Sequence, residues 1–307
     1  MKNIFENTKS IWVKYSDYEI KKADNGVDYI TPTKDATPTM YKPFDVSEQL
    51  VVGAINIGKM LIAKEDEKKI DKAIMKFVRD FGLLGIMTAI PTTPSFMDYE
   101  AVYLTKNPFI EDESMNTFGY LGYFFPFEKP ELSKKGKESR WDVGGDVGSM
   151  ALALTLSNEP MAFALCLQKL YAEPLDWIKM QFKDWAFTFI TSTLFYEDKA
   201  TLTDEQKQLY QRSILVYDGI APTYHIALKE DKPVLVWDFY SLSNVIRLMF
   251  STSLTDEKNP LRLCKHCQKV YIASRPNAVF CSTQCKNRYN VYKTRKKNKD
   301  YKLHKAI

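Results

Sequence analysis

The residues best suited to chemistry in this sequence are four cysteines that lie close together. Cys264 and Cys267 are separated by two residues, Cys281 and Cys285 by three, and 13 residues lie between the two pairs. Two close pairs joined by a short loop can bring four thiolates to one tetrahedral zinc ion. Disulfides are the alternative, but nothing in the sequence directs the chain to an oxidising compartment. We therefore expect a structural zinc site with these four cysteines as ligands.

The remaining cysteine and the three histidines are weaker candidates for a site. Cys166 lies in the apolar run 161–170, where a free cysteine is expected to be a small buried hydrophobe. His266 lies between the first two cysteines, and four thiolates are available without it. A catalytic metal site that relies on histidine would be hard to assemble from His225, His266 and His304.

Charge separates the cysteine-rich segment from the rest of the chain. Residues 261–307 carry 13 lysines and arginines and one acid, Asp300, a net charge of +12. The other 260 residues carry 30 cations and 37 acids, a net charge of −7. Such a split points to a module that binds a polyanion, with a solvated basic tail as the alternative. The expected partner is nucleic acid, DNA in preference to RNA.

The cysteines must be positioned by a small module that cannot hold a fold unaided. It has 47 residues, many of them charged, so it can bury little apolar surface. Zinc would supply the missing folding free energy, on the order of 10 kcal/mol. We expect Cys264 and Cys267 in a knuckle, a β-prone run at 270–272, and a helix that is capped by Ser282 and reaches about Lys299. The last two ligands would then lie on the first turn of the helix, a treble-clef-like arrangement.

The faces of this predicted helix differ in chemistry. At about 100° per residue, Tyr289 and Tyr292 fall on the side of Cys285 and are expected to pack over the metal core. Amide and hydroxyl side chains gather on the opposite side, flanked by cations. Lysine and arginine can hold phosphates while asparagine reaches base edges in a groove. The expected nucleic-acid contacts are Lys286, Asn287, Arg288, Asn290, Lys293, Arg295, Lys296 and Lys297.

Segments 261–267, 280–288 and 292–295 resemble the CGNR-type bacterial zinc fingers, over about 40 of the 307 residues. All four cysteines match ligand positions of that family. Lys286 replaces the family glycine, and the cysteine pairs and the loop are one or two residues tighter. The resemblance implies a bacterial transcription regulator in which the finger follows a larger N-terminal domain. That domain would sense a small-molecule or protein ligand, or mediate assembly.

The pattern upstream of the cysteines predicts an α+β domain that is mostly helical. Extended or short β structure is expected at 11–45, and a loop-like stretch at 91–149. A β-hairpin is expected from the runs 224–228 and 234–239. Helical spacing and capping signals predict helices at 47–63, 66–81, 174–195, 241–254 and one that starts at Thr203. The domain boundaries are then 1–254 for this domain, 261–300 for the zinc finger and 301–307 for a basic tail.

No catalytic motif stands out in the first 254 residues. The glycine-rich stretch 144–149 lacks the lysine of a P-loop and the spacing of a dinucleotide fingerprint. Spacing alone does not select the pair Asp142 and Asp146 as a general acid and base. The aromatic cluster at 120–127 is expected to be core. An enzyme with an unrecognised site in this domain, or a finger that binds an acidic protein, remain the alternatives.

Composition and hydropathy exclude other classes. With 45% hydrophobic and 13% aromatic residues the chain is not disordered. The longest apolar run, 50–63, is shorter than the roughly 20 residues that a bilayer requires and contains Lys59. Residues 1–10 contain Glu6 and Lys9, where a signal peptide would be apolar. We expect a cytoplasmic protein with no membrane partner.

Overall fold

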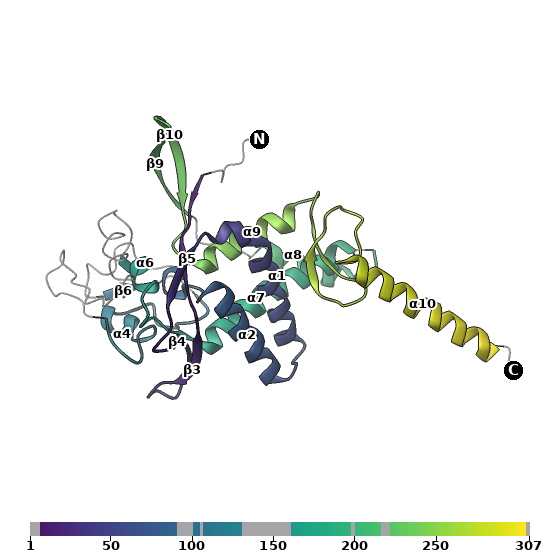
Figure 1. The fold of residues 1–307 in the computed structure, drawn as a ribbon, viewed down its shortest axis with the longest axis horizontal. Helices are drawn as coiled ribbons and strands as arrows, with labels where there is room; N and C mark the ends of the chain where they lie inside the picture. Colours follow the sequence, from purple (N-terminus) through teal and green to yellow (C-terminus); the bar gives the residue numbers. More distant parts are fainter. Residues whose placement is uncertain are drawn as a thin grey trace.

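A computed structural model gives the fold (Figure 1). It describes residues 7–90, 101–104, 107–130, 161–197, 200–215 and 222–304, with the backbone alone at 161, 194–197, 213–215 and 296–304. A helical body carries a β-hairpin arm, and a long helix extends from it in a different direction. The chain thus combines helices with small sheets, as the sequence predicts. The glycine-rich stretch 144–149 and the acids Asp142 and Asp146 lie outside the described residues.

The N-terminal strands form two small sheets on one side of the body. β2 pairs antiparallel with β5, and β4 lies between β3 and β8. Buried aromatic residues anchor them, with Trp12 and Tyr15 of β2 only 2% and 3% exposed. The strands are β2 (Trp12–Tyr15), β3 (Tyr18–Lys22), β4 (Asp28–Pro32), β5 (Pro38–Tyr41) and β8 (Glu173–Pro174).

Two helices follow the 3₁₀ turn Pro43–Val46: α1 (Ser47–Ile62) and α2 (Glu67–Phe81). The Asp66 side chain accepts a hydrogen bond from Lys69 N–H, an N-cap that satisfies one free amide at the start of α2. α2 ends at Gly82, whose φ of +90° suits glycine, and a Cβ there would lie 2.2 Å from the Val13 carbonyl oxygen. Both predicted helices are confirmed.

The centre of the body is the contact between α1 and α7 (Leu175–Glu197). Phe182, Trp185 and Phe189 of α7 are fully buried. Gly58 of α1 permits close approach, because a Cβ there would lie 1.9 Å from the Phe182 carbonyl oxygen. A larger side chain at this position would force the two helices apart.

The stretch predicted as a loop contains regular structure in its described part. β6 (Ala101–Tyr103) pairs with β7 (Ser114–Asn116), and α4 (Thr117–Gly122) follows. The prediction was wrong here because short elements are set by long-range packing rather than by local pattern. Tyr120, Phe124 and Phe125 are at most 1% exposed, so the prediction that the aromatic cluster is core is confirmed.

The remaining elements of the body that the structure describes are four helices and the strands of the hairpin arm with β1. Thr203 and Gln206 form the predicted capping box, with reciprocal hydrogen bonds of 3.0 and 3.2 Å. The predicted hairpin is present, and β1 extends its sheet on the β10 side. The elements are β1 (Thr8–Lys9), α3 (Ile86–Ala89), α6 (Met161–Cys166), α8 (Asp204–Leu215), β9 (Thr223–Lys229), β10 (Lys232–Asp238) and α9 (Leu242–Thr255).

The cysteine-rich segment is packed against this body. It contains β11 (Leu261–Leu263), β12 (Val270–Ile272) and α10 (Thr283–His304). α10 continues past Lys299, so the helix is longer than predicted and runs into the segment assigned to a basic tail. Leu261 and Val270 share a hydrophobic cluster with residues of α1, α7 and α9, and they are 8% and 2% exposed. The body and the finger therefore share one core cluster.

Among the described residues, no helix has the length and apolar character needed to cross a membrane.

Candidate functional site

The first cysteine pair is held by a tight turn between β11 and β12. Cys264 N–H donates to the Lys269 carbonyl and Gln268 N–H to the Cys264 carbonyl, each at 2.9 Å. Gln268 has a φ of +57°, the left-handed conformation that allows the chain to reverse here. Lys265 N–H donates to the Val279 carbonyl at 2.9 Å, which ties the turn to the segment preceding Cys281.

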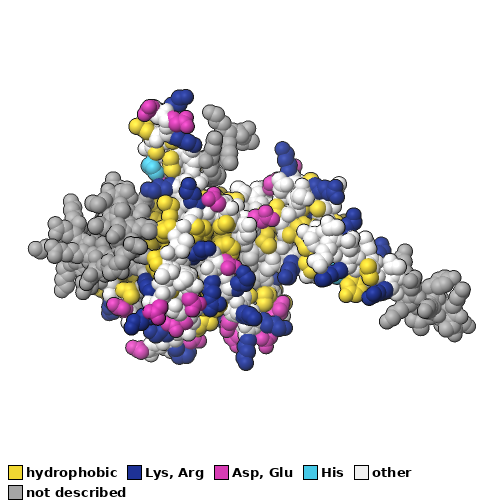
Figure 2. All heavy atoms as spheres, in the orientation of Figure 1, with side chains coloured by type: hydrophobic (Ala, Val, Ile, Leu, Met, Phe, Trp, Pro, Cys, Tyr) yellow, Lys and Arg dark blue, Asp and Glu magenta, His cyan; other side chains and the backbone are white. Residues whose placement is uncertain are grey.

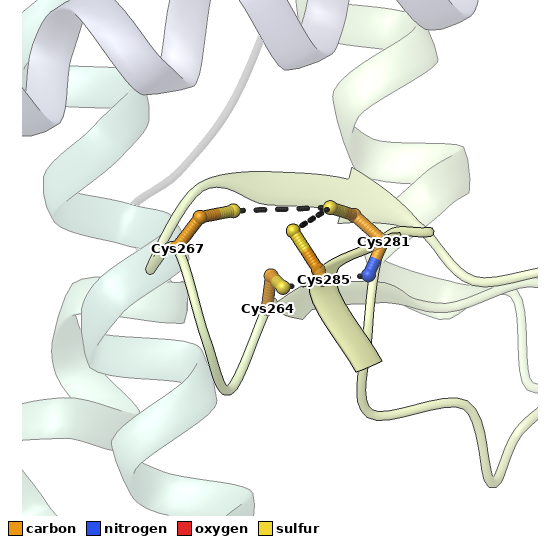
Figure 3. Close-up of side chains that lie close together, drawn as sticks. All are labelled: Cys264, Cys267, Cys281 and Cys285. Atoms are coloured by element: carbon orange, nitrogen blue, oxygen red, sulfur yellow. Dashed lines mark hydrogen bonds between the residues drawn. The ribbon is translucent and has the colours of Figure 1, made fainter. Parts of the chain in front are cut away.

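The structure brings all four predicted ligands together (Figure 3). Their Sγ atoms lie within 4.8 Å of one another and form no disulfide. The Sγ–Sγ distance is 3.8 Å between Cys267 and Cys281 and 3.5 Å between Cys281 and Cys285. A tetrahedron of sulfurs about 2.3 Å from its centre has edges of about 3.8 Å. The cluster therefore has the donor type and the dimensions of a tetrahedral metal site, compatible with a metal such as zinc.

The electrostatics of the four sulfurs favour a cation at the centre of the cluster. Burial alone raises the pKa of Cys264, but hydrogen bonds from the backbone N–H groups of Cys267, Cys281 and His266 outweigh it and lower the pKa to about 6. Burial and the neighbouring thiols raise the pKa of Cys281 to about 12. Four neighbouring thiols cannot all ionise to thiolates without a cation, because their negative charges repel one another. A bound divalent metal would deprotonate the coordinating thiols.

The second cysteine pair fixes the start of α10. Ser282 Oγ accepts from Cys285 N–H at 3.2 Å, and the Ser282 carbonyl accepts from Lys286 N–H at 3.1 Å. The predicted N-cap is therefore confirmed. Tyr289 is half-buried, with its ring centroid 5.2 Å from that of Phe280. Tyr292 stacks on His266 at 5.8 Å but is 60% exposed, so the prediction that it packs over the metal core was wrong.

The predicted nucleic-acid contacts all lie on α10, which extends away from the body (Figure 1). Figure 2 shows lysine and arginine side chains along the visible face of the finger and the described part of this helix. Lys296 and Lys297 lie on α10, but their side chains are outside the described part of the chain. The other six are exposed: Lys286, Asn287, Arg288, Asn290, Lys293 and Arg295.

A contact that the sequence did not predict joins α1 of the body to the segment that follows the first cysteine pair. Asn56 Oδ1 accepts from Val270 N–H at 2.9 Å, and Asn56 Nδ2 donates to the Val270 carbonyl at 3.2 Å. Lys59, one turn further along α1, donates to the carbonyl of Gln268, beside Cys267. Its ammonium places a positive charge near sulfurs that carry net negative charge when they hold a divalent metal. The only sequence signal was an amide between Ile55 and Ile57 of an apolar helix.

Replacing Asn56 with leucine is expected to lower the free energy of unfolding by about 2 kcal/mol. The variant leaves the N–H and carbonyl of Val270 without the amide that now pairs with both. Chemical denaturation measures the change. Gln208→Leu on α8 is the matched control: the same kind of amide is lost from an exposed position, and the expected change is under about 0.5 kcal/mol. Equal stabilities of the two variants would contradict the role of Asn56.

The buried ionisable groups of the body have structural partners. Burial raises the pKa of Glu173, whose carboxylate accepts from Leu84 N–H, Ile86 N–H and the Tyr171 hydroxyl at 2.7 to 2.8 Å. Cys166 is 3% exposed, so the prediction of a small buried hydrophobe is confirmed, and burial raises the pKa of its thiol to about 12. The cavity beside Cys166 and Tyr171 measures about 10 Å³, which holds at most one water molecule.

Comparisons of the chain with protein-family models, with curated proteins and with solved structures find no match. The site therefore rests on its own geometry: a metal-sized sulfur cluster at the start of an exposed cationic helix.

Proposed function

We propose that the protein is a zinc-dependent nucleic-acid-binding protein that contacts DNA through α10. The observation that carries the proposal is the position of the cysteine cluster. Cys281 precedes the first turn of α10 and Cys285 lies in it, so a metal held there fixes the direction of the cationic helix relative to the body. A fixed helix presents its charges as a rigid surface and loses little conformational entropy on binding.

Zinc is the proposed metal because the four donors are thiolates in a compact tetrahedral arrangement. No position is left for water or substrate once four sulfurs coordinate the ion, so the role of the metal is structural. The knuckle, hairpin and helix suit a treble-clef-like finger of the type that the CGNR resemblance implies. A divalent metal would also allow sulfurs 3.5 to 3.8 Å apart to ionise together.

DNA is the proposed nucleic acid because a single helix can enter the major groove of B-form DNA, which is about 12 Å wide. The major groove of A-form RNA is deep and narrow and does not admit side chains in the same way. Lys286, Arg288, Lys293 and Arg295 are placed to hold phosphates, and Asn287 and Asn290 to reach base edges. Lys296 and Lys297 continue the cationic sequence along the same helix.

The proposed role of the body is to sense a ligand or partner for a transcription regulator. Support comes from two grooves at the junction between body and finger, of about 500 and 560 Å³. Both are lined by Asp256 of the linker together with residues of α9. One also includes Ile272 of β12, and the other Leu261 and Arg262 of β11. A molecule bound in either groove would contact body and finger at once.

The proposal is tested by selecting bound sequences from random DNA and RNA pools, with zinc present and with a chelator. We expect enrichment from the DNA pool that is lost on chelation, because the metal fixes the helix that reads the groove. Enrichment from neither pool, together with capture of acidic proteins, would favour the protein-interaction alternative. Enrichment that survives chelation would contradict the dependence on metal.

A further inference from the structure

The β9–β10 arm extends away from the body on a side different from α10 (Figure 1). Its two strands pair over their whole length, from Thr223 opposite Asp238 to Lys229 opposite Lys232. Glu230 and Asp231 form a two-residue turn with φ of +51° and +60°, the left-handed conformation that matches the twist of a hairpin. The arm is therefore a regular hairpin with a defined register.

One face of the arm is apolar. Tyr224, Ile226 and Leu228 of β9 lie on the same face and are 64%, 73% and 76% exposed. Their partners on β10 are Trp237, Leu235 and Pro233. Figure 2 shows hydrophobic side chains along the arm, with both signs of charge near its tip. Apolar side chains that are this exposed and contiguous are typical of an interaction surface.

The same three residues of β9 have their backbone groups at an open strand edge. In a two-residue hairpin the residues that flank the turn exchange backbone hydrogen bonds, and every second pair does so along the strands. The intervening residues Tyr224, Ile226 and Leu228 direct their N–H and C=O groups away from β10. Within the described part of the chain, no strand pairs with this edge of β9.

The edge also lacks the usual protection against pairing with another strand. Protected edges carry charges, proline or a bulge. Between Thr223 and Leu228 the strand contains none of these except His225, whose Nδ1 lies 2.8 Å from Asp238 Oδ2 within the arm. A long uncharged edge with an apolar face is a template for an added strand.

We propose that β9 pairs antiparallel with β9 of a second copy of this chain, about a two-fold axis at Ile226. In this register Ile226 lies opposite Ile226 of the other copy, and Tyr224 lies opposite Leu228. The three residues with outward backbone groups are thereby paired with one another, which gives six inter-chain hydrogen bonds. The two three-stranded sheets, each of order β1-β10-β9, then become one continuous six-stranded sheet.

Charge favours a second copy over a different partner. The tip residues Lys229, Glu230, Asp231 and Lys232 sum to zero, so the arm attracts neither a polyanion nor a polycation. In the two-fold register Lys229 lies opposite Thr223, and no like charges face each other across the new strand pair. The strand is therefore complementary to itself in backbone, side-chain type and charge, which an isologous interface requires.

The test is the mass of the purified protein in solution, measured by light scattering over a concentration series. The wild type is expected to approach twice the chain mass of 35.6 kDa. Ile226→Lys is expected to be monomeric, because two ammonium groups would face each other at the axis. The variant should fold normally, since Ile226 is 73% exposed. Leu209→Lys is the matched control, an exposed leucine on α8, and it should remain dimeric.

A charge exchange makes the test specific for the proposed register. Ile226→Glu alone is also expected to be monomeric, whereas an equimolar mixture of Ile226→Lys and Ile226→Glu should return to the dimer mass. A monomeric wild type would overturn the proposal, even if the arm captured another protein as its added strand. So would a dimer that Ile226→Lys leaves intact. Neither measurement involves DNA, so the result is independent of the proposed function.

Discussion

Cys264→Ser is expected to leave the protein without stoichiometric metal and to weaken its binding to DNA at least about tenfold, a cost of about 1.4 kcal/mol. Serine does not supply the thiolate that a tetrahedral sulfur site requires. Structural zinc contributes on the order of 10 kcal/mol to small modules of this type. Without it, the start of α10 loses the contact that fixes its direction.

The loss of ordered structure in Cys264→Ser is expected to affect the chain after β12 and to leave β12 and the body intact. Leu261 and Val270 are buried in the cluster shared with the body, and Asn56 is hydrogen-bonded to Val270. These contacts do not depend on a metal.

The loop before Phe280 has hydrogen bonds of its own to the Lys265 N–H and the Tyr271 hydroxyl. The start of α10 depends on Cys281 and Cys285 for its link to the first cysteine pair, and ordering each residue costs about 1 to 2 kcal/mol. The body should therefore keep its melting temperature while the finger helix becomes sensitive to protease.

Elemental analysis of protein purified under reducing conditions measures the metal. Fluorescence anisotropy with a labelled duplex measures the affinity, and limited proteolysis locates the loosened segment. Cys166→Ala is the control, because Cys166 is buried in the body and should retain full metal content. Metal absent from the wild type, or full occupancy in Cys264→Ser, would contradict the site.

Sequence was sufficient for the elements whose signals are local. α2 was predicted at 66–81 from an apolar stripe that ends before Gly82. In the structure the Asp66 side chain caps the helix and Gly82, with a positive φ, ends it. The capping box of α8 and the hairpin of the arm were found in the same way. In each case the residues that identify the element in the sequence also make its stabilising contacts, so a local pattern is enough to predict it.

The contacts that sequence could not supply are those between distant segments. β6 and β7 are three residues each and gain their stability from packing, so nothing local marks them. The spacing of the four cysteines predicted the cluster, but not that Asn56 and Lys59 of α1 bind the backbone of Val270 and Gln268 from more than 200 residues away. Tyr292 was assigned to the metal core from helical phase alone, whereas its ring stacks on His266 and remains 60% exposed.

Replacing Lys286, Arg288, Lys293 and Arg295 together with glutamine is expected to weaken DNA binding by about three orders of magnitude or more at about 0.1 M salt. Each cation that neutralises a phosphate releases a counterion, which contributes about 0.9 to the slope of log K against log salt. The six cations proposed as phosphate contacts give a slope of about −5, and the two of them that remain, Lys296 and Lys297, give about −2. Glutamine keeps helix propensity close to that of lysine and arginine, so the helix itself should persist.

The matched control has the same change in net charge at another place. Lys68, Lys69, Lys72 and Lys76 are exposed on α2, and their replacement by glutamine should leave both affinity and slope near those of the wild type. Equal losses in the two quadruple variants would mean that only the overall charge attracts DNA. The α10 variant should also retain its metal, whereas Cys264→Ser retains its charges. Binding that needs both the cations and the cluster therefore separates a rigid DNA-reading helix from a basic segment that binds any polyanion.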